Sequence, residues 1–512
     1  MKVLLSIFFS IISFLCIAQD SAYFNKLIFP YINATNPIMS VVKQDSGYSL
    51  SMLSYDTIQK LCAIDIDNNG LIVKKNCWSL NSTTSIYQYP GNSFIKSNDS
   101  NYIFASVRMD TSGVIQGLLN KVSSETLDTI WTRTYTHPDT AAALQPGADI
   151  FNAFTAIRQT LDGGFIITGM YNPNCNTNGD RRAYLLKIDS VGDVQWIKKY
   201  PQIGSLYDIE LAPDSGFYFP AVLNLYTPRV YKINKQGITE WYLDVNSNIK
   251  AGYPMDLKIL DSNYLYVTSK YLYDLVYLKS GITLTKINIT THTEEWEKNY
   301  ILFNTFECFS LHQSMGLDIL PSGDLIITGT SHMVNPDNPN ELGYKGVIMK
   351  VNSNGDSLWA RWHGHGLFAD DCQINDIVLT DDGGFLATGW QWHNNGGLFF
   401  QNAWLLKMDS MGCDTAGCHI YDGFDREVNY KIEFRVFPNP TDDILNIEFD
   451  KVYNHEIKIK IYNSIGQLVL EKSSEKGVTL QRINIKAISR GIYFIEIVDK
   501  NGILTSDKFI IE

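Results

Sequence analysis

The 512-residue sequence lacks the features that define several large classes of protein. No run of lysine or arginine interrupts its net charge of −12, so binding to nucleic acid phosphates is not expected. After the first residues, no apolar segment is long enough to cross a membrane, and long helical patterns are absent. A Gly-x-Ser-x-Gly elbow, a phosphate-binding loop, a His-Glu-x-x-His helix and a dinucleotide fingerprint are also missing. These absences favour an acidic, all-β protein and weigh against the common enzyme classes.

The N-terminus has the order of a secretory signal peptide. Lys2 is followed by an apolar run over residues 3–17 and then by Ala18, after which we expect cleavage. The apolar run is too short for a comfortable transmembrane helix. The sequence therefore predicts a signal peptide at residues 1–18 and an exported chain with no transmembrane segment after its removal.

Seven cysteines remain after that cleavage, and an odd number leaves at least one thiol outside any intramolecular disulfide. Cys413 and Cys418 enclose a short loop containing glycine and are the first candidate pair. Cys62 and Cys77 flank the turn at Asp67 on opposite arms of a hairpin, so they could also meet. The strand register decides that second pairing, because a one-residue bulge would separate them.

A tight turn followed by an apolar strand recurs along the chain, most clearly as LDGGFIITG at residues 161–169. The aromatic or apolar residue after each turn recurs every 47 to 63 residues, which indicates a repeat architecture. These seven residues are Tyr48, Tyr102, Phe165, Phe217, Tyr264, Leu325 and Phe385.

Two further markers follow in each unit. A Lys-apolar-Asp or similar triplet, such as Lys187 to Asp189, precedes a turn that glycine closes in five copies. A tryptophan then opens another strand, at positions 78, 131, 196, 241, 296 and 359. The seventh unit lacks this tryptophan, and the spacing places Phe24 there, so we expect residues 23–29 to supply the last strand of the seventh unit.

Strands such as FIITG are apolar on both faces, as sheets packed between neighbours require. The variable insertions, residues 171–182, 331–345 and 391–401, fall between the second and third strands and should form loops on one face. The sequence predicts an all-β chain: a seven-bladed β-propeller at residues 19–418, a linker at 419–430, and a small immunoglobulin-like β-sandwich at 431–512.

The C-terminal residues carry four motifs, VFPNPT from Val436, IYNSIGQ from Ile461, SRGIY from Ser489 and KFII from Lys508. In order and spacing they resemble the type A C-terminal sorting domain of the type IX secretion system. The resemblance implies export from a Bacteroidetes-type bacterium, secretion or display at the outer-membrane surface, and the secretion machinery as a partner. The residues that carry it are Pro438, Asn439, Pro440, Gly466, Gly491 and Tyr493.

Three groups of residues suggest ligand chemistry, each with a structural alternative. His363 and His365, with His393, are the densest set of zinc ligand types, and Asp65, Asp67 and Asn69 begin like a calcium loop. The alternatives are a polar loop between blades and an ordinary hairpin turn. No cofactor is predicted beyond these two options. The aromatic residues of the seventh unit could stack on sugar or anchor a protein, or could pack over their own loop, and these are Trp390, Trp392, Phe399 and Phe400.

Two functions remain open from the sequence. One is a secreted or surface-displayed binding or adhesion module with a glycan or protein ligand, which the missing catalytic motifs favour. The other is a secreted hydrolase or lyase acting on polysaccharide or peptide.

Overall fold

The computed structural model describes most of the chain. The described residues are 23–28, 35–55, 58–81, 84–111, 113–141, 151–172, 181–204, 206–223, 227–245, 252–274, 279–300, 316–335, 338–367, 370–395, 398–415, 434–449, 457–463, 467–474, 477–498 and 504–512. The predicted signal peptide and the predicted linker both lie outside the described residues. Contacts divide the chain into two units, Met1–His419 and Ile420–Glu512. No helix among the described residues has the length and apolarity needed to span a membrane.

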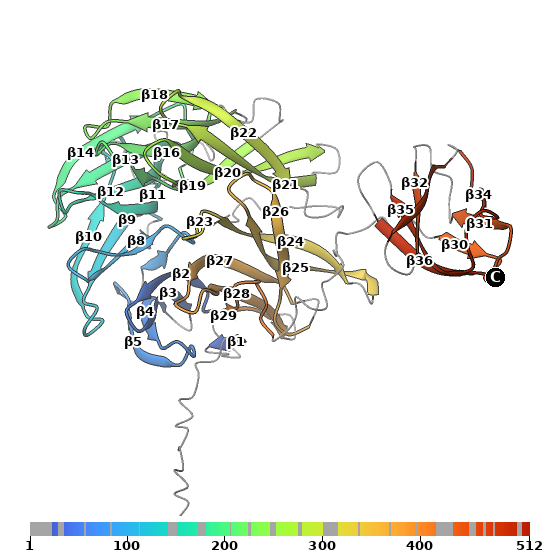
Figure 1. Cartoon of the computed structure of the whole chain (residues 1–512). Helices are drawn as coiled ribbons and strands as arrows, with labels where there is room; N and C mark the ends of the chain where they lie inside the picture. The colour runs from blue at the N-terminus through green and yellow to red at the C-terminus, as the bar shows by residue number, and fades with distance from the viewer. Residues whose placement is uncertain are drawn as a thin grey trace, which may run out of the picture. The chain divides into compact units, whose positions relative to one another are not determined.

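The first unit consists of seven antiparallel sheets arranged in a ring, as the sequence predicts (Figure 1). Blades 1 to 3 contain β2 (Ile38–Gln44), β3 (Gly47–Tyr55), β4 (Gln59–Ile66) and β5 (Ile72–Trp78); β6 (Ser85–Tyr87), β7 (Phe94–Lys96), β8 (Tyr102–Met109), β9 (Ile115–Val122) and β10 (Thr129–Tyr135); and β11 (Asn152–Gln159), β12 (Phe165–Tyr171), β13 (Arg182–Ile188) and β14 (Val194–Tyr200). A single helical turn, α1 (Pro138–Ala141), follows blade 2.

The remaining blades continue the same order. Blades 4 to 7 contain β15 (Glu210–Leu211), β16 (Phe217–Leu223), β17 (Thr227–Ile233) and β18 (Thr239–Asp244); β19 (Gly252–Ile259), β20 (Tyr264–Asp274), β21 (Lys279–Asn288) and β22 (Thr293–Tyr300); β23 (Leu317–Ile319), β24 (Leu325–Asn335), β25 (Asn338–Val351) and β26 (Ser357–His363); and β27 (Cys372–Leu379), β28 (Phe385–Asn395), β29 (Leu398–Met408) and β1 (Phe24–Ile28). The inner strands lie at one edge of each sheet and contact the inner strand of a neighbouring blade, and they are β2, β7, β11, β15, β19, β23 and β27.

Six of the seven recurring residues that follow a tight turn occupy equivalent positions at the start of a buried strand, which confirms the repeat. The choice of Tyr264 was wrong by one residue, because Leu265 lies opposite Ile287, as Phe165 lies opposite Ile188. In blade 3, Phe165 begins β12, and every residue of this strand is buried between neighbouring sheets. The turn between β13 and β14 has the expected chemistry, since Asp189 Oδ1 accepts hydrogen bonds from Val191 N at 3.0 Å and Asp193 N at 2.8 Å. Gly192 closes it at a φ of 92°, a conformation that L side chains rarely adopt.

The lysine of the Lys-apolar-Asp marker has a structural role that recurs in five blades. Its ammonium group forms an ion pair with the aspartate of the preceding Asp-containing turn, as in Lys187–Asp162 at 3.0 Å. The equivalent pairs are Lys121–Asp99, Lys232–Asp214, Lys350–Asp324 and Lys407–Asp382. These lysine side chains are mostly buried, so each pair ties the turn between the first and second strands to the third strand of the same blade.

The outer-strand tryptophans pack on the turn glycine of the next blade. A Cβ on Gly237 would lie 3.1 Å from Trp196, and one on Gly355 would lie 2.8 Å from Trp296, so only glycine fits there. Five of the six tryptophans are equivalent, because each lies directly opposite the lysine of the Lys-apolar-Asp marker in its blade. In blade 3, for example, Trp196 lies opposite Lys187. The assignment of Trp78 to this position is wrong, because Lys74 occupies it opposite Asp65, while Trp78 lies opposite Leu61.

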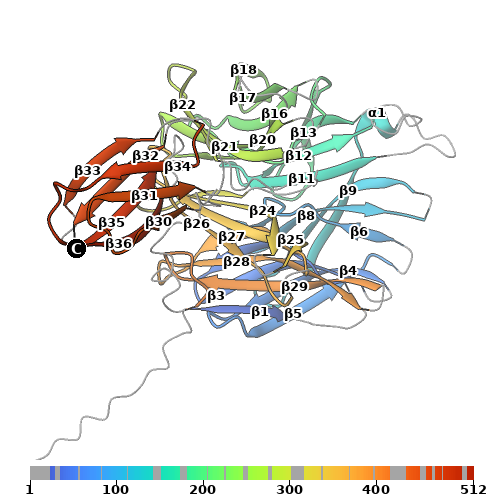
Figure 2. The same cartoon turned by 90° about the vertical axis from the view of Figure 1, so that its right-hand side faces the viewer.

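The ring closes through the N-terminal strand, as predicted from the missing seventh tryptophan. β1 pairs antiparallel with β29, and Phe24 lies opposite Lys407 (Figure 2). A Cβ on Gly70 would lie 2.7 Å from the Phe24 ring, so Phe24 takes the place that tryptophan has in other blades. Joining the two ends of the propeller in one sheet removes the open edges that an unclosed ring would leave.

The predicted insertion loops of blades 6 and 7 are instead extensions of the second and third strands. β24 and β25 pair from Leu325 to Asn335, and β28 and β29 stay in register from Phe385 to Asn395. Backbone pairing replaces the loops predicted at residues 331–345 and 391–401, because the N–H and C=O groups of the two arms bond to each other across each hairpin, with a register shift between Val334 and Asn335. Most of the remaining predicted insertion, at residues 171–182 of blade 3, lies outside the described residues, which omit 173–180.

Cys62 and Cys77 form a disulfide between β4 and β5, where they are directly opposite in register. Cys413 is also disulfide-bonded, and Cys418, its expected partner, lies outside the described residues. Cys372 is a buried free cysteine.

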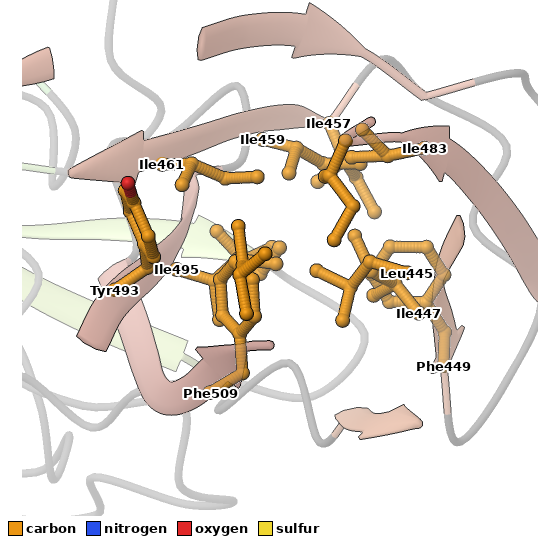
Figure 3. Packing of buried hydrophobic residues seen from close by; sticks show 13 residues of the cluster. Leu445, Ile447, Phe449, Ile457, Ile459, Ile461, Ile483, Tyr493, Ile495 and Phe509 are labelled. Carbon is orange, nitrogen blue, oxygen red and sulfur yellow. The ribbon is translucent and has the colours of Figure 1, made fainter. Parts of the chain in front are cut away.

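The second unit is the predicted two-sheet β-sandwich. One sheet has the order β30 (Phe434–Phe437), β31 (Ile444–Phe449) and β34 (Leu480–Asn484), and the other has the order β33 (Leu468–Ser473), β32 (Lys458–Asn463), β35 (Gly491–Val498) and β36 (Leu504–Ile511). Residues from both sheets, including Leu445, Ile459, Ile495 and Phe509, form one buried apolar core (Figure 3).

The C-terminal motif residues stabilise this sandwich. Asn439 Nδ2 donates to Lys508 O at 3.1 Å, and Asn439 Oδ1 accepts from Ile510 N at 3.0 Å, so its amide satisfies the open edge of β36. Thr441 continues this cap, because its N–H donates to Ile510 O and its carbonyl accepts from Glu512 N. Tyr493 is buried on Phe509, and its hydroxyl donates to Ser489 O at 2.7 Å. Pro438 and Pro440 flank Asn439, Gly491 begins β35, and Gly466 lies outside the described residues.

Candidate functional site

The inner strands carry carboxylates at equivalent positions in blades 4, 5 and 7. Asp208 Oδ2 accepts a hydrogen bond from Leu257 N at 3.1 Å, and Asp256 Oδ2 accepts one from Leu317 N at 2.9 Å. Asp376 Oδ2 accepts one from Val41 N at 2.9 Å. Each of these aspartates therefore binds the backbone of the next blade and holds two inner strands together.

The position two residues after these aspartates carries a charged side chain in some blades and an apolar side chain in the others. The charged residues are Arg158, Glu210, Lys258 and Asp318 in blades 3 to 6, and the apolar residues are Val378, Val42 and Ile95 in blades 7, 1 and 2. All seven are partly exposed. The middle of the ring thus has one charged side and one apolar side.

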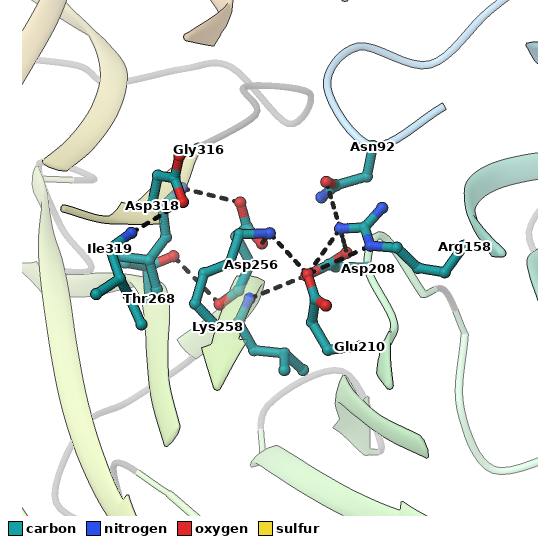
Figure 4. A network of polar contacts seen from close by, with 12 residues as sticks. Asn92, Arg158, Asp208, Glu210, Asp256, Lys258, Thr268, Gly316, Asp318 and Ile319 are labelled. Carbon is teal, nitrogen blue, oxygen red and sulfur yellow. Dashed lines mark hydrogen bonds and ion pairs between the residues drawn. The ribbon is translucent and has the colours of Figure 1, made fainter. Parts of the chain in front are cut away.

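The charged residues are linked in a network across blades 2 to 6 (Figure 4). The Arg158 guanidinium lies 2.8 Å from Asp208 and 3.0 Å from Glu210, and it donates to Asn92 Oδ1 at 2.7 Å. Lys258 Nζ lies 2.7 Å from Glu210 and 3.8 Å from Asp256. We call Arg158, Asp208, Glu210, Asp256 and Lys258 the central ion network.

The environment shifts the pKa values of the two aspartates in this network in opposite directions. Burial opposes ionisation of Asp208, but Arg158 and Lys258 outweigh it and lower its pKa. Burial raises the pKa of Asp256 well above its ordinary range, against the attraction of Lys258 and with the repulsion of Asp208. A hydrogen bond between the two carboxyl groups acts in the same directions, because it raises the pKa of Asp256 and lowers that of Asp208. A carboxyl group with a raised pKa beside an ammonium group occurs in active sites as well as in structural networks.

The sequence motifs did not single out this network. Its signal is positional, because Asp208, Asp256 and Asp376 precede the recurring aromatic residue of their units by eight or nine residues. Alignment of the units on that residue would have revealed the shared position, whereas a search for adjacent carboxylates could not.

The aromatic residues of blade 7 lie on a paired hairpin and not in a loop. Trp390 and Trp392 are both on β28, and their rings form an edge-to-face pair with centroids 6.1 Å apart. Trp392 is 39% exposed, and Phe400 lies on β29 opposite His393. The side chain of Phe399 lies outside the described residues. The hairpin therefore presents a fixed tryptophan pair to solvent.

The histidines do not form the strand arrangement expected for zinc. β26 ends at His363, so His365 lies beyond the strand and the alternation that would align the two rings does not apply. His363 Nδ1 lies 3.7 Å from Asp414, while His365 Nδ1 lies 3.1 Å from Asn25 Oδ1. Burial raises the pKa of the nearby Cys372 thiol to about 11.

Among the described residues, no group of three or more His, Cys, Asp or Glu side chains could hold a metal ion, and the side chain of His393 is not described. At the expected calcium loop, Asp67 Oδ1 accepts hydrogen bonds from Asn69 N and Leu71 N, as in an ordinary hairpin turn. The metal sites stay predictions.

Comparison with known proteins defines the class of the C-terminal unit. Residues 435–512 match the family of secretion system C-terminal sorting domains. The chain is therefore an all-β, type IX-secreted protein, found in the medium or at the outer-membrane surface, in which seven propeller blades precede the sorting domain. The sorting domain implies interaction with the type IX machinery.

Other similarities are partial. Over 80 residues the chain is 35% identical to an endo-acting ulvan lyase of Formosa agariphila, which is 16% of this chain and 15% of that protein. Similar solved structures include a protein of unknown function from Dyadobacter fermentans, with 10% identity, 75% and 98% of the two chains covered and a TM-score of 0.42. They also include the Neurospora crassa Pan2 WD40 domain, with 9% identity, 73% and 88% covered and a TM-score of 0.38.

Proposed function

We propose that the secreted propeller is a binding or adhesion module whose ligand meets the face formed by the extended β24–β25 and β28–β29 hairpins. The observation that supports this most is the Trp390–Trp392 pair, because Trp392 is exposed while the strand beneath it is paired on both sides. Large aromatic side chains held rigidly at a surface supply contact area with little loss of entropy on binding.

The register explains why this surface needs no folding on binding. Trp390 lies opposite Gln373 on β27 and opposite Ala403 on β29, and Trp392 lies opposite Gln401. Covering one such ring contributes about 1.5 to 3 kcal/mol. A glycan or protein that covers both rings would therefore gain useful affinity from this hairpin alone.

The second candidate is a hydrolase or lyase acting on polysaccharide or peptide. Asp256 favours it, since burial raises the pKa of its carboxyl group, which lies 3.8 Å from Lys258 Nζ. Against it, the described carboxylates of the inner strands at Asp208, Asp256 and Asp376 already accept backbone hydrogen bonds between blades.

The test is a screen of the mature protein against glycan and protein arrays, with turnover measured for every ligand that binds. We expect saturable binding without turnover, and Trp392→Ala should weaken it about tenfold or more. Tyr242→Ala is the matched control, because Tyr242 is an exposed aromatic residue on the outer strand β18. Turnover that is lost in Asp256→Asn would instead establish the enzyme, and binding unchanged in Trp392→Ala would remove the hairpin from the proposal.

Export has a separate test. Deletion of residues 431–512 should leave the propeller in the periplasm, since this removes the sorting domain. Normal delivery of the truncated chain to the surface or medium would contradict that role.

A further inference from the structure

Four side chains come from the segments that precede the inner strands of blades 2, 3 and 4 and the third strand of blade 3. Phe151 directly precedes β11, Tyr89 and Tyr207 precede β7 and β15, and Arg181 directly precedes β13. First and third strands of an antiparallel blade run in the same direction, so their beginnings lie at the same edge. By the same rule, the end of β28 and the beginning of β29 lie at the corresponding edge of blade 7. We call Tyr89, Phe151, Arg181 and Tyr207 the entry cluster.

Contacts place the entry cluster near the middle of the ring. The Tyr89 and Tyr207 rings have centroids 6.5 Å apart although they come from blades 2 and 4, which are not neighbours. Side chains from these two blades can meet only where the inner strands converge. The central ion network begins beside them, because Asn92 and Asp208, which both bind Arg158, follow the two tyrosines closely in sequence.

A positive charge is held against these aromatic rings. The Arg181 guanidinium lies over the Phe151 ring at 4.5 Å from its centroid, and its side chain is exposed. Burial raises the pKa of the Tyr89 hydroxyl, with Tyr207 adding to the effect and the Arg181 charge opposing it. Arg181 is therefore close enough to act electrostatically on Tyr89, which connects the two aromatic pairs into one cluster.

The chemistry of this cluster fits an acidic sugar. Aromatic rings stack on the apolar faces of pyranose rings, and a guanidinium held by stacking keeps its N–H groups ready for a carboxylate. The chain has a net charge of −12, so an anionic ligand is repelled at long range unless a local cation attracts it. A neutral glycan would not require that cation.

We propose that the entry cluster is a binding subsite for an acidic oligosaccharide, with the sugar rings on Tyr89, Tyr207 and Phe151 and a uronate carboxylate on Arg181. This inference rests on the proposed binding function and adds a ligand class and a second contact region to it. Tyr89 and Tyr207 set the position of the sugar chain, and Arg181 selects its charge.

Titration calorimetry of the full-length mature protein tests the subsite with two probes, tetragalacturonic acid and its methyl ester, which share a sugar backbone and differ in charge. The wild-type protein should bind the acid about 10 to 100 times more tightly than the ester, as a charge-assisted pair predicts. Arg181→Gln should abolish this preference and leave ester binding unchanged. Tyr207→Ala should weaken binding of both probes.

The control is Arg133→Gln, which removes an equal charge from the outer strand β10, where Arg133 pairs with Asp193 at 3.0 Å. It should bind both probes like the wild type. An acid preference that survives Arg181→Gln, or equal binding of the two probes by the wild type, would overturn the subsite. If neither probe binds while another glycan or a peptide binds in a Trp392-dependent way, the subsite fails and the proposed binding function stands.

Discussion

Closure of the propeller depends on Asn25, a single side chain that joins its two ends. Asn25 Nδ2 donates to Gly364 O at 2.8 Å and to Asp414 Oδ2 at 3.0 Å. Its Oδ1 accepts from Trp404 Nε1 at 2.8 Å and lies 3.1 Å from His365 Nδ1. The N-terminal strand is thereby attached to β29, to the segment between blades 6 and 7, and to the end of the propeller.

Asn25→Ala should lower the free energy of unfolding by about 4 kcal/mol. The neutral hydrogen bonds contribute about 1 kcal/mol each, and the bond to the Asp414 carboxylate contributes about 1.5 to 3 kcal/mol. The Trp404 side chain is 1% exposed, so its N–H would also lose its partner without access to water. These terms overlap, because one side chain makes all of the bonds.

Urea unfolding followed by tryptophan fluorescence measures this effect on the propeller alone, since all ten tryptophans precede the sorting domain. Asn76→Ala is the matched control. Asn76 donates to Leu127 O at 3.0 Å and Asp128 Oδ1 at 3.2 Å on the outside of blade 1, so its loss should cost about 1 kcal/mol. Equal losses in the two variants would refute the role of Asn25 in closure.

Four further predictions follow from other contacts. Replacing both Cys62 and Cys77 with alanine should lower stability by about 3 kcal/mol in urea, as expected for a loop of this length, and an unchanged midpoint would contradict it. Lys258→Met should cost about 3 kcal/mol by leaving Glu210, whose side chain is only partly exposed, with less compensation, whereas Lys298→Met, at a surface pair of 3.7 Å, should cost under about 1 kcal/mol. The pKa of Asp99 is lowered, because Lys121 and Ser97 outweigh its burial, so its contribution is present above the unfolded pKa of about 4 and is lost as pH falls; Asp99→Asn should flatten thermal stability in that acidic range, and an unchanged pH profile would argue against the pair. Asn439→Ala should unfold the edge of the sorting domain and reduce export, while Asn446→Ala, which loses one exposed bond to Phe437 O, should be exported normally; equal export of both would contradict the edge-capping role.

Repeating features could be predicted from the sequence because each has a local cause. The residue after each tight turn, such as Phe165, begins a buried strand, and glycines such as Gly192 adopt positive φ where a hairpin closes. Counting from these residues also identified Phe24 as the closing residue. The same method misplaced Trp78, because a count along the strand does not reveal which residue lies opposite Asp65.

Contacts between blades could not be predicted in the same way. Asn25 meets Asp414 and His365 across more than 330 residues, and Tyr89 meets Tyr207 across a whole blade. No periodicity in the sequence encodes such pairs, because they depend on where the ring closes. The candidate metal and aromatic residues were chosen by local density, which led to a predicted loop where β28 and β29 form a ladder.

The two kinds of position on the inner strands separate stability from recognition. Asp208, Asp256 and Asp376 hold neighbouring blades through backbone amides, and this role is structural. Two residues further along, Val378, Val42 and Ile95 serve blades 7, 1 and 2 without any charge, so the fold does not require ions at this position. Buried ion pairs add little net stability over apolar side chains of similar size. The charged residues of blades 3 to 6 therefore need another explanation, and contact with a polar ligand at the middle of the ring, next to the entry cluster, is the one we infer.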